Sequence, residues 1–223
     1  MKILSLEFSS QRRSVAVVEA GPSQEPQVLA ESGEMGGRST RAISMIEEAL
    51  RTAKLEREQI ECVAVGLGPG SYNGVRAALA VAQGWQLARE IRLVGISSAE
   101  SMAAQASANG FIGRVVVTID AQRGEFYLAV YEITGDGWRE LEPLSVVPLA
   151  AVQSRALAGD FVIGPEASEW VPSGRAMFPS AARLGILAAT RSDFVPGHQL
   201  EPIYLRETQF VKAPPPRVLP EGL

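Results

Sequence analysis

The pattern of apolar and polar positions in the first half of the chain predicts three strands followed by alternating helices and strands. Short apolar runs between polar or Gly/Pro-rich turns are typical of strands, and apolar residues at helical spacing predict helices. Strands are expected at residues 3–8, 14–18, 27–34, 61–66 and 93–96, and helices at 40–54, at 72–89 and from near Ser98. In this order the two later strands are expected to run parallel to the first.

The second half of the chain repeats this order in a weaker form. Strands are expected at 114–119 (ending at Asp120), 124–133, 140–147 and 161–163, and helices at 150–157 and 180–190. The sequence therefore predicts an α/β fold of two lobes built from one supersecondary unit, the second lobe reduced. We expect a first lobe over residues 1–107, a smaller second lobe over 108–212 and an extended tail over 213–223.

The composition excludes several classes of function. With 46% hydrophobic residues, 21% charged residues and a formal net charge of −4, the chain has the profile of a soluble globular protein and lacks basic runs for binding nucleic acid. Its start, MKILSLEF, has too short an apolar run for a signal peptide, and no window reaches the length of a membrane span. We therefore expect a cytoplasmic protein with no membrane contact.

The chain contains one cysteine and one histidine. Cys62 lies in an apolar run, where it is expected to be a buried packing residue, and an internal disulfide is impossible. Because His198 is the only histidine and lies in a Pro/Gly-rich loop, no pair of histidines can hold a metal as in a metallopeptidase. We expect no metal site and no cofactor.

An acidic residue ends the first predicted strand, and the layout resembles the ribonuclease-H-like lobes of the actin-like ATPase superfamily, which includes sugar kinases and Hsp chaperones. There the first hairpin carries Asp-x-Gly-x-Ser/Thr, whose backbone holds phosphate while the Asp positions a metal or water. Here the hairpin reads Glu7-Phe8-Ser9-Ser10-Gln11, with Glu in place of Asp and Ser9 in place of the glycine. We expect this hairpin to be damaged for catalysis, and no residue is assigned a catalytic role.

The stretch GLGPGSYNGVR, residues 66–76, joins a predicted strand to a predicted helix. It lacks the lysine of a Walker loop, and Ser71 stands where the dinucleotide fingerprint needs a glycine. Backbone N–H groups at a helix start can still bind an anion, which makes Ser9, Ser10, Gly70 and Ser71 candidates for an anion or nucleotide contact. Alternatively, the glycines only permit a sharp reversal, and Ser71 or Asn73 caps the helix. Both interpretations remain open.

The helix predicted at 72–89 is apolar nearly all round, and the helix at 40–54 has a wide apolar face. A helix of this kind is buried on more than one side, either within its own chain or against a partner. The small or apolar residues that would form a partner surface are Ala42, Met45, Ala49, Ala78, Val81 and Trp85.

Several blocks of the chain resemble the TsaB (YeaZ) family of bacterial threonylcarbamoyladenosine biosynthesis subunits, once labelled glycoprotease homologues. The most specific block is VAVGLGPGSYNGVRAALAVAQGWQLA, which is similar to the family's Gly-Pro-Gly-Ser-Phe-Thr-Gly-Leu-Arg signature. MKILSLEFSS, LVGISSAESMA, VVVTIDAQRGEFYLAVY, PSAARLGILA and EPIYLRE resemble its other blocks. The departures are Glu7 for Asp, Tyr72 for Phe, Asn73 for Thr, and Arg38-Ser39-Thr40 for a His-Ser-Glu-like stretch.

The resemblance implies a non-catalytic paralogue of TsaD, the subunit that transfers threonylcarbamoyl to the adenosine beside the tRNA anticodon. It implies a heterodimer with TsaD through a bundle of the first two helices of each chain, with TsaE in the larger complex and tRNA bound only through that complex. A homodimer of the isolated chain stays open. The alternative is an active ATPase or kinase of the actin-like superfamily that retains a degraded phosphate hairpin.

Overall fold

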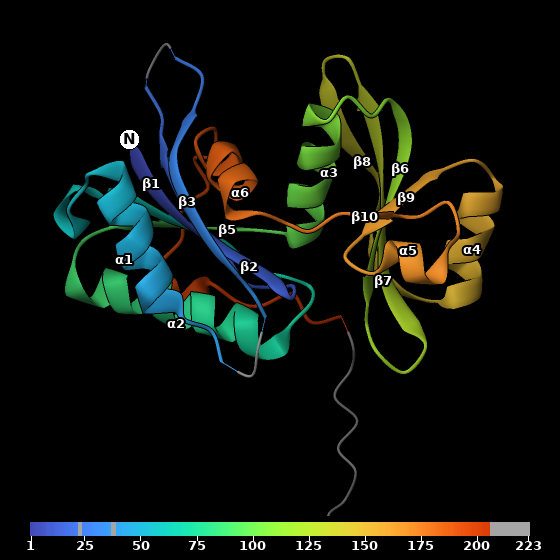
Figure 1. Ribbon diagram of the computed structural model, residues 1–223, viewed down its shortest axis with the longest axis horizontal. Helices are drawn as coiled ribbons and strands as arrows, with labels where there is room; N and C mark the ends of the chain where they lie inside the picture. The colour runs from blue at the N-terminus through green and yellow to red at the C-terminus, as the bar shows by residue number, and fades with distance from the viewer. Residues whose placement is uncertain (22–23, 37–38, 206–223) are drawn as a thin grey trace, which may run out of the picture.

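The computed structural model describes residues 1–21, 24–36 and 39–205, and they form two five-stranded sheets side by side (Figure 1). The first sheet has the order β3-β2-β1-β4-β5, and the second has the order β10-β9-β6-β7-β8. The strands of the first are β1 (Lys2–Glu7), β2 (Arg12–Glu19), β3 (Gln27–Met35), β4 (Cys62–Gly66) and β5 (Arg92–Ile96). Those of the second are β6 (Gly113–Asp120), β7 (Glu125–Thr134), β8 (Gly137–Pro148), β9 (Phe161–Gly164) and β10 (Arg175–Ala176).

The two sheets share one topology. In each, the first three strands are antiparallel neighbours, the fourth pairs in parallel with the first, and the fifth pairs in parallel with the fourth. This confirms the predicted α/β fold of two repeated lobes. The second lobe is the reduced one, because β10 has only 2 residues.

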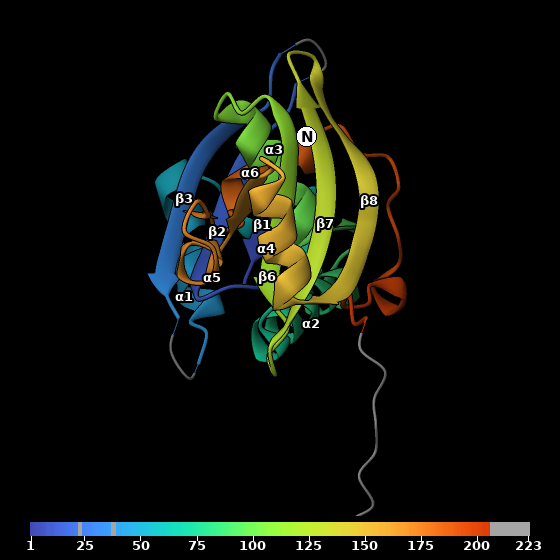
Figure 2. The ribbon, with the colours of Figure 1, turned by 90° about the vertical axis from the view of Figure 1, so that its right-hand side faces the viewer.

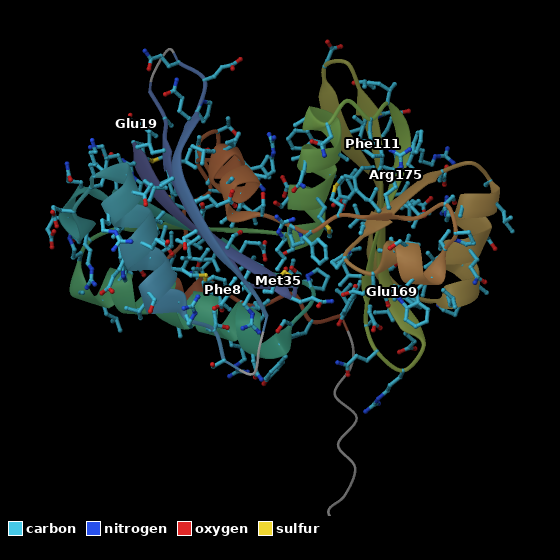
Figure 3. All side chains as sticks on the ribbon, viewed as in Figure 1. Phe8, Glu19, Met35, Phe111, Glu169 and Arg175 are labelled. Carbon is cyan, nitrogen blue, oxygen red and sulfur yellow. The ribbon has the colours of Figure 1, made fainter. Side chains whose placement is uncertain are left out.

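The central strands of the first sheet are buried on both faces, which is why they read as continuous apolar runs. Helices α1 (Ala42–Ala53) and α2 (Tyr72–Ala88) cover one face, where Leu4, Leu6 and Phe8 face them in the core (Figure 3). Helix α6 (Ala181–Ala188) covers the other face, where its Leu184 packs with Ile3 and Ala64. The 3₁₀ turns η1 (Arg57–Gln59) and η2 (Gly197–Gln199) lie beside this lobe.

The last helix of each lobe, α3 in the first and α6 in the second, lies between the two sheets. Helix α3 (Ser98–Ala108) follows the first sheet in the chain but packs its Met102 and Ala106 against the second sheet. Helix α6 follows the second sheet but packs on the first, and α3 and α6 contact each other between them (Figure 1). The division at residues 107 and 108 stays a prediction, and this exchange of helices crosses it.

Helices α4 (Leu149–Leu157) and α5 (Ala167–Trp170) cover the remaining face of the second sheet (Figure 2). The N-cap position of α1 is occupied by Arg41, and no side chain caps this helix. Ser71 caps α2, as the sequence allowed, and Ser180 caps α6. The tail at 213–223 lies outside the described residues.

Cys62 is confirmed as a buried residue of β4. Burial raises the pKa of its thiol to about 12, so the thiolate is strongly disfavoured at neutral pH. His198 lies exposed in η2.

Candidate functional site

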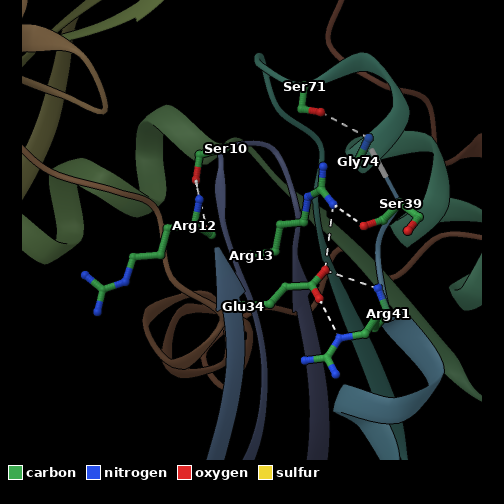
Figure 4. A network of polar contacts seen from close by, with 8 residues as sticks. All are labelled: Ser10, Arg12, Arg13, Glu34, Ser39, Arg41, Ser71 and Gly74. Carbon is green, nitrogen blue, oxygen red and sulfur yellow. Dashed lines mark hydrogen bonds and ion pairs between the residues drawn. The ribbon is translucent and has the colours of Figure 1, made fainter. Parts of the chain in front are cut away.

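The glycine-rich turn, residues 66–76, packs directly against the turn between β1 and β2. The Ser71 N–H donates to the Ser9 carbonyl oxygen at 2.6 Å. A Cβ atom added to Gly70 would overlap that oxygen, and one added to Gly74 would overlap the Phe8 carbonyl oxygen. The Ser71 hydroxyl accepts from the Gly74 N–H at 3.3 Å and so caps α2 (Figure 4). The glycines are therefore required because two backbones meet at this point.

Glu7, the last residue of β1, is fully buried, and its carboxylate is held from two sides. Oε1 accepts from the Ser9 N–H at 2.9 Å, and Oε2 accepts from the Ser98 hydroxyl at 2.9 Å. Gly66 lies so close that an added Cβ would overlap the carboxylate. Burial raises the pKa of Glu7 above its ordinary value, and the hydrogen bonds from Ser9 and Ser98 oppose this rise. The carboxylate joins β1 to the start of α3 inside the protein.

A cleft of about 650 Å³ lies between the two lobes, and we call it the interlobe cleft. Its first-lobe wall includes Ser9, Ser10, Gly70 and Ser71, which come from the hairpin and from the glycine-rich turn. The structure thus brings together the four candidates for an anion contact, and the contact itself stays a prediction. Glu7 is not among the described residues that line the cleft.

The second lobe contributes two carboxylates to the interlobe cleft, those of Asp120 and Glu166. Asp120 ends β6 as Glu7 ends β1, and it accepts from the Gln122 N–H at 2.6 Å. Burial and the neighbouring charge of Asp120 raise the pKa of Glu166. The sequence predicts Asp120 at the end of a strand, but it shows no clear second phosphate hairpin, and neither Asp120 nor Glu166 was assigned to a site. An acid at the end of the first strand of the repeated unit was the available signal.

Arg13 lines the same cleft and ties the hairpin to the segment before α1. Its guanidinium donates to the Ser39 carbonyl oxygen at 3.0 Å and lies 3.7 Å from Glu34, to which Arg41 donates at 3.1 Å (Figure 4). Burial acts to raise the pKa of Glu34, but Arg41 and Arg13 outweigh it and the pKa is lowered. The first-lobe wall of the cleft therefore carries the positive charge of Arg13, whereas the second-lobe wall carries two carboxylates.

Comparison with known proteins places this geometry in a family. The model of the TsaD family, described as tRNA N6-adenosine threonylcarbamoyltransferase, matches residues 38–190. The chain belongs to the TsaD family, in its TsaB (YeaZ) branch. It is 28% identical to the tRNA threonylcarbamoyladenosine biosynthesis protein TsaB of Escherichia coli K12, over 92% of this chain and 95% of that one. YeaZ from Pseudomonas aeruginosa superposes with a TM-score of 0.76 and 26% identity, over 92% of this chain and 99% of that one.

The TsaB resemblance points to α1 and α2 as docking helices, but most of the residues chosen for that surface face inward. Ala42, Met45, Ala49 and Ala78 are buried in the chain's own core, so these four are corrected to core residues. Val81 and Trp85 are partly buried and pack against the same core. The wide apolar face of each helix is explained by burial against the sheet and against the neighbouring helix. The outward face of the two helices instead carries Ile43, Ala80, Gly84 and Leu87.

The helices and the possible metal-binding side chains of residues 1–21, 24–36 and 39–205 bear on two further kinds of site. None of the helices in this part of the chain is both long and apolar enough to cross a bilayer. Over the same residues, no three His, Cys, Asp or Glu side chains gather in a group that could hold a metal ion.

Proposed function

We propose that this chain is a non-catalytic scaffold subunit of the complex that transfers threonylcarbamoyl to the adenosine beside the anticodon of tRNA. It forms a heterodimer with TsaD in the cytoplasm, TsaE joins the larger complex, and tRNA is bound through the complex. The family match supports this pathway, as does the role of the TsaB relatives, which are named tRNA threonylcarbamoyladenosine biosynthesis proteins.

The buried carboxylate of Glu7 is the observation that carries the non-catalytic part of the proposal. A group that positions a metal ion or an attacking water must face the substrate. Glu7 instead accepts hydrogen bonds from Ser9 and Ser98 inside the protein, with Gly66 packed against it. The acid of the first hairpin therefore supports structure, and the chain needs a partner to supply the chemistry.

The outward face of α1 and α2 supports the docking part of the proposal. Leu87 is 90% exposed and Ile43 is 57% exposed, so each presents an apolar side chain that a partner helix could cover. One and two turns before Leu87, α2 presents the exposed Gly84 and Ala80, and a Cβ atom added to Gly84 would meet open space. Small exposed residues allow a partner helix to approach closely.

Two leucines with the same exposure provide a matched test of docking. Leu87 on α2 and Leu157 on α4 are each 90% exposed, so a charge at either position leaves the fold intact. We expect Leu87→Asp to weaken binding to the TsaD of the same organism about a hundredfold, since an unpaired carboxylate at an interface centre costs about 3 kcal/mol. Leu157→Asp is expected to bind as the unchanged chain does. Calorimetry with both variants, after equal melting temperatures are established, measures this, and equal affinities would contradict the docking face.

A reconstitution assay tests the scaffold role itself. The purified chain alone is expected to hydrolyse no ATP above background, while its addition to TsaD and TsaE restores tRNA modification. ATP turnover by the isolated chain that Asp120→Asn abolishes would favour the alternative of an active actin-like ATPase. The Leu157→Asp variant serves as the purification control, because a contaminating ATPase would persist in every preparation.

A further inference from the structure

The last described segment of the chain, residues 200–205, leaves the first lobe and enters the space between the lobes. Leu200 is buried in the first-lobe core, and the Ile203 N–H donates to the Leu67 carbonyl oxygen at 2.9 Å. The Tyr204 ring then stacks on Tyr72 of α2, with centroids 5.5 Å apart and planes at 25°. The segment is thus fixed to the first lobe at three successive points, of which only Leu200 is deeply buried.

Arg76 closes a small cluster around Tyr204. Its guanidinium donates to the Tyr72 hydroxyl at 2.6 Å and lies 5.0 Å from the centroid of the Tyr72 ring, on which Tyr204 stacks. Tyr72 and Tyr204 remain 55% and 47% exposed. The stack can therefore open without exposing the core, in contrast to the Leu200 contact.

The same segment borders both sides of the contact between the lobes. Ile203 and Tyr204 line the interlobe cleft together with Tyr127 of β7. Ile203 and Leu205 also line a second cavity of about 350 Å³, whose second-lobe wall includes Trp138 of β8. In Figure 1 the red end of the described chain passes between α2 and the lower end of β7. Residues 203–205 therefore lie between the lobes, and their backbone hydrogen bond and ring stack are both made to the first lobe.

We propose that residues 203–205 form a latch that sets how far the two lobes open, with the Tyr204–Tyr72 stack as its releasable contact. While the stack is formed, Tyr204 stands at the edge of the interlobe cleft and the segment packs between α2 and the second sheet. When the stack opens, residues 203–205 rotate about the buried anchor Leu200 and leave the space between the lobes. The lobes then separate. The latch needs no partner chain, so it is independent of the proposed pairing.

Spin labels can measure the lobe opening in the full chain. With Cys62 replaced by serine, cysteines at the exposed positions Glu58 of the first lobe and Asp136 of the second carry the labels. We expect Tyr204→Ala to broaden and lengthen the distance distribution between the labels, and Tyr204→Phe, which keeps the stack, to leave it nearly unchanged. Leu157→Ala is the control for loss of an exposed apolar side chain. An unchanged distribution in Tyr204→Ala would overturn the latch.

Hydrogen exchange separates a latch from a segment that merely packs on the first lobe. In Tyr204→Ala we expect amide exchange at least tenfold faster in residues 200–205 and also in the cleft turns at 8–13 and 120–124, with α6 unchanged. Arg76→Gln provides a second variant that leaves both tyrosines in place, and it is expected to act in the same direction with a smaller effect. Faster exchange confined to residues 200–205 in both variants would contradict the proposal.

Discussion

The hairpins at the start of the two lobes have the same topology, but their acidic residues lie in opposite environments. In the first lobe Glu7 is fully buried and held by Ser9 and Ser98, whereas in the second lobe Asp120 lines the interlobe cleft. Each carboxylate accepts a hydrogen bond from the backbone N–H two residues later. The local turn is thus repeated, and the surroundings decide whether the acid is a structural or an accessible group.

The difference comes from what packs behind each hairpin. Gly66 at the end of β4 and the start of α3 enclose Glu7, while the longer side chain moves its carboxylate toward them. Asp120 has the neighbouring acid Glu166 beside it, which raises the cost of burying either charge. A repeated fold therefore does not imply that corresponding residues keep corresponding roles.

We expect the largest difference between the two hairpins when each acid is replaced by alanine. Glu7→Ala leaves a cavity and two buried donors without an acceptor, so we expect a loss of about 3 kcal/mol in the free energy of unfolding. Asp120→Ala should cost less than about 1 kcal/mol, because water can reach the groups that its carboxylate contacts. Urea denaturation followed by circular dichroism measures both, and similar losses would mean that Glu7 is not the structural acid.

The contact between Gly66 and Glu7 provides a second test. Gly66→Ala is expected to lower the free energy of unfolding by about 2 kcal/mol, since the added methyl group overlaps the Glu7 carboxylate. Combined with Glu7→Ala, which removes that carboxylate, the same substitution should cost about 1 kcal/mol less than it does alone. Strictly additive losses in the double variant would show that the overlap is relieved elsewhere.

The raised pKa of Glu7 predicts a smaller, pH-dependent effect. The folded chain binds the Glu7 proton more tightly than the unfolded chain does. The free energy of unfolding therefore falls as pH rises from 4.5, the ordinary pKa of a glutamate, to the raised pKa of Glu7 in the folded chain. The stability of the unchanged chain relative to Glu7→Gln should therefore decrease across this window and stay constant above it. Denaturation of both chains between pH 4 and neutral pH checks the sign, and a relative stability that rises with pH would exclude it.

We expect the smallest effect on stability from substitutions in the turns of the two hairpins. Arg123, in the second-lobe turn, has a φ of 60°, which costs a residue with a side chain about 1 to 2 kcal/mol. Glycine relieves this strain but has a larger conformational entropy in the unfolded chain, so Arg123→Gly should stabilise by about 0.5 kcal/mol. Ser10→Gly in the first-lobe turn, where no such φ is found, should not stabilise. Melting temperatures of the two variants provide the comparison.

Most of the fold could be predicted from the sequence, because nearly every strand and helix has a clear period or apolar run. The exceptions are β10 and α5, which have 2 and 4 residues and are too short to show a pattern. Periodicity also indicates that a helix is buried but not against which sheet, so the exchange of α3 and α6 between the lobes could not be read from it.

The candidate site was predictable only in part. The sequence identified the hairpin and the glycine-rich turn, whose residues meet at the Ser9–Ser71 contact. It could not distinguish inner from outer positions on α1 and α2. An alanine is compatible with either side of a helix, so the sequence does not show that Ala49 faces the sheet and Ala80 faces solvent. The carboxylates of Asp120 and Glu166 are separated in the chain by three strands and a helix (β7, β8, α4 and β9), and the parallel pairing of β6 with β9 brings them together.

The helix exchange has a consequence for the order in which this chain acquires its structure on the ribosome. The first sheet is complete once β5 has emerged, yet much of its second face is covered by α6, whose Ala181 is hydrogen bonded to Ser5 and Ser14 across 176 and 167 residues. A lobe near the start of a chain usually finishes folding before the rest is made. Here the N-terminal lobe cannot finish covering this apolar face until α6 has emerged, when almost the whole chain has been synthesised.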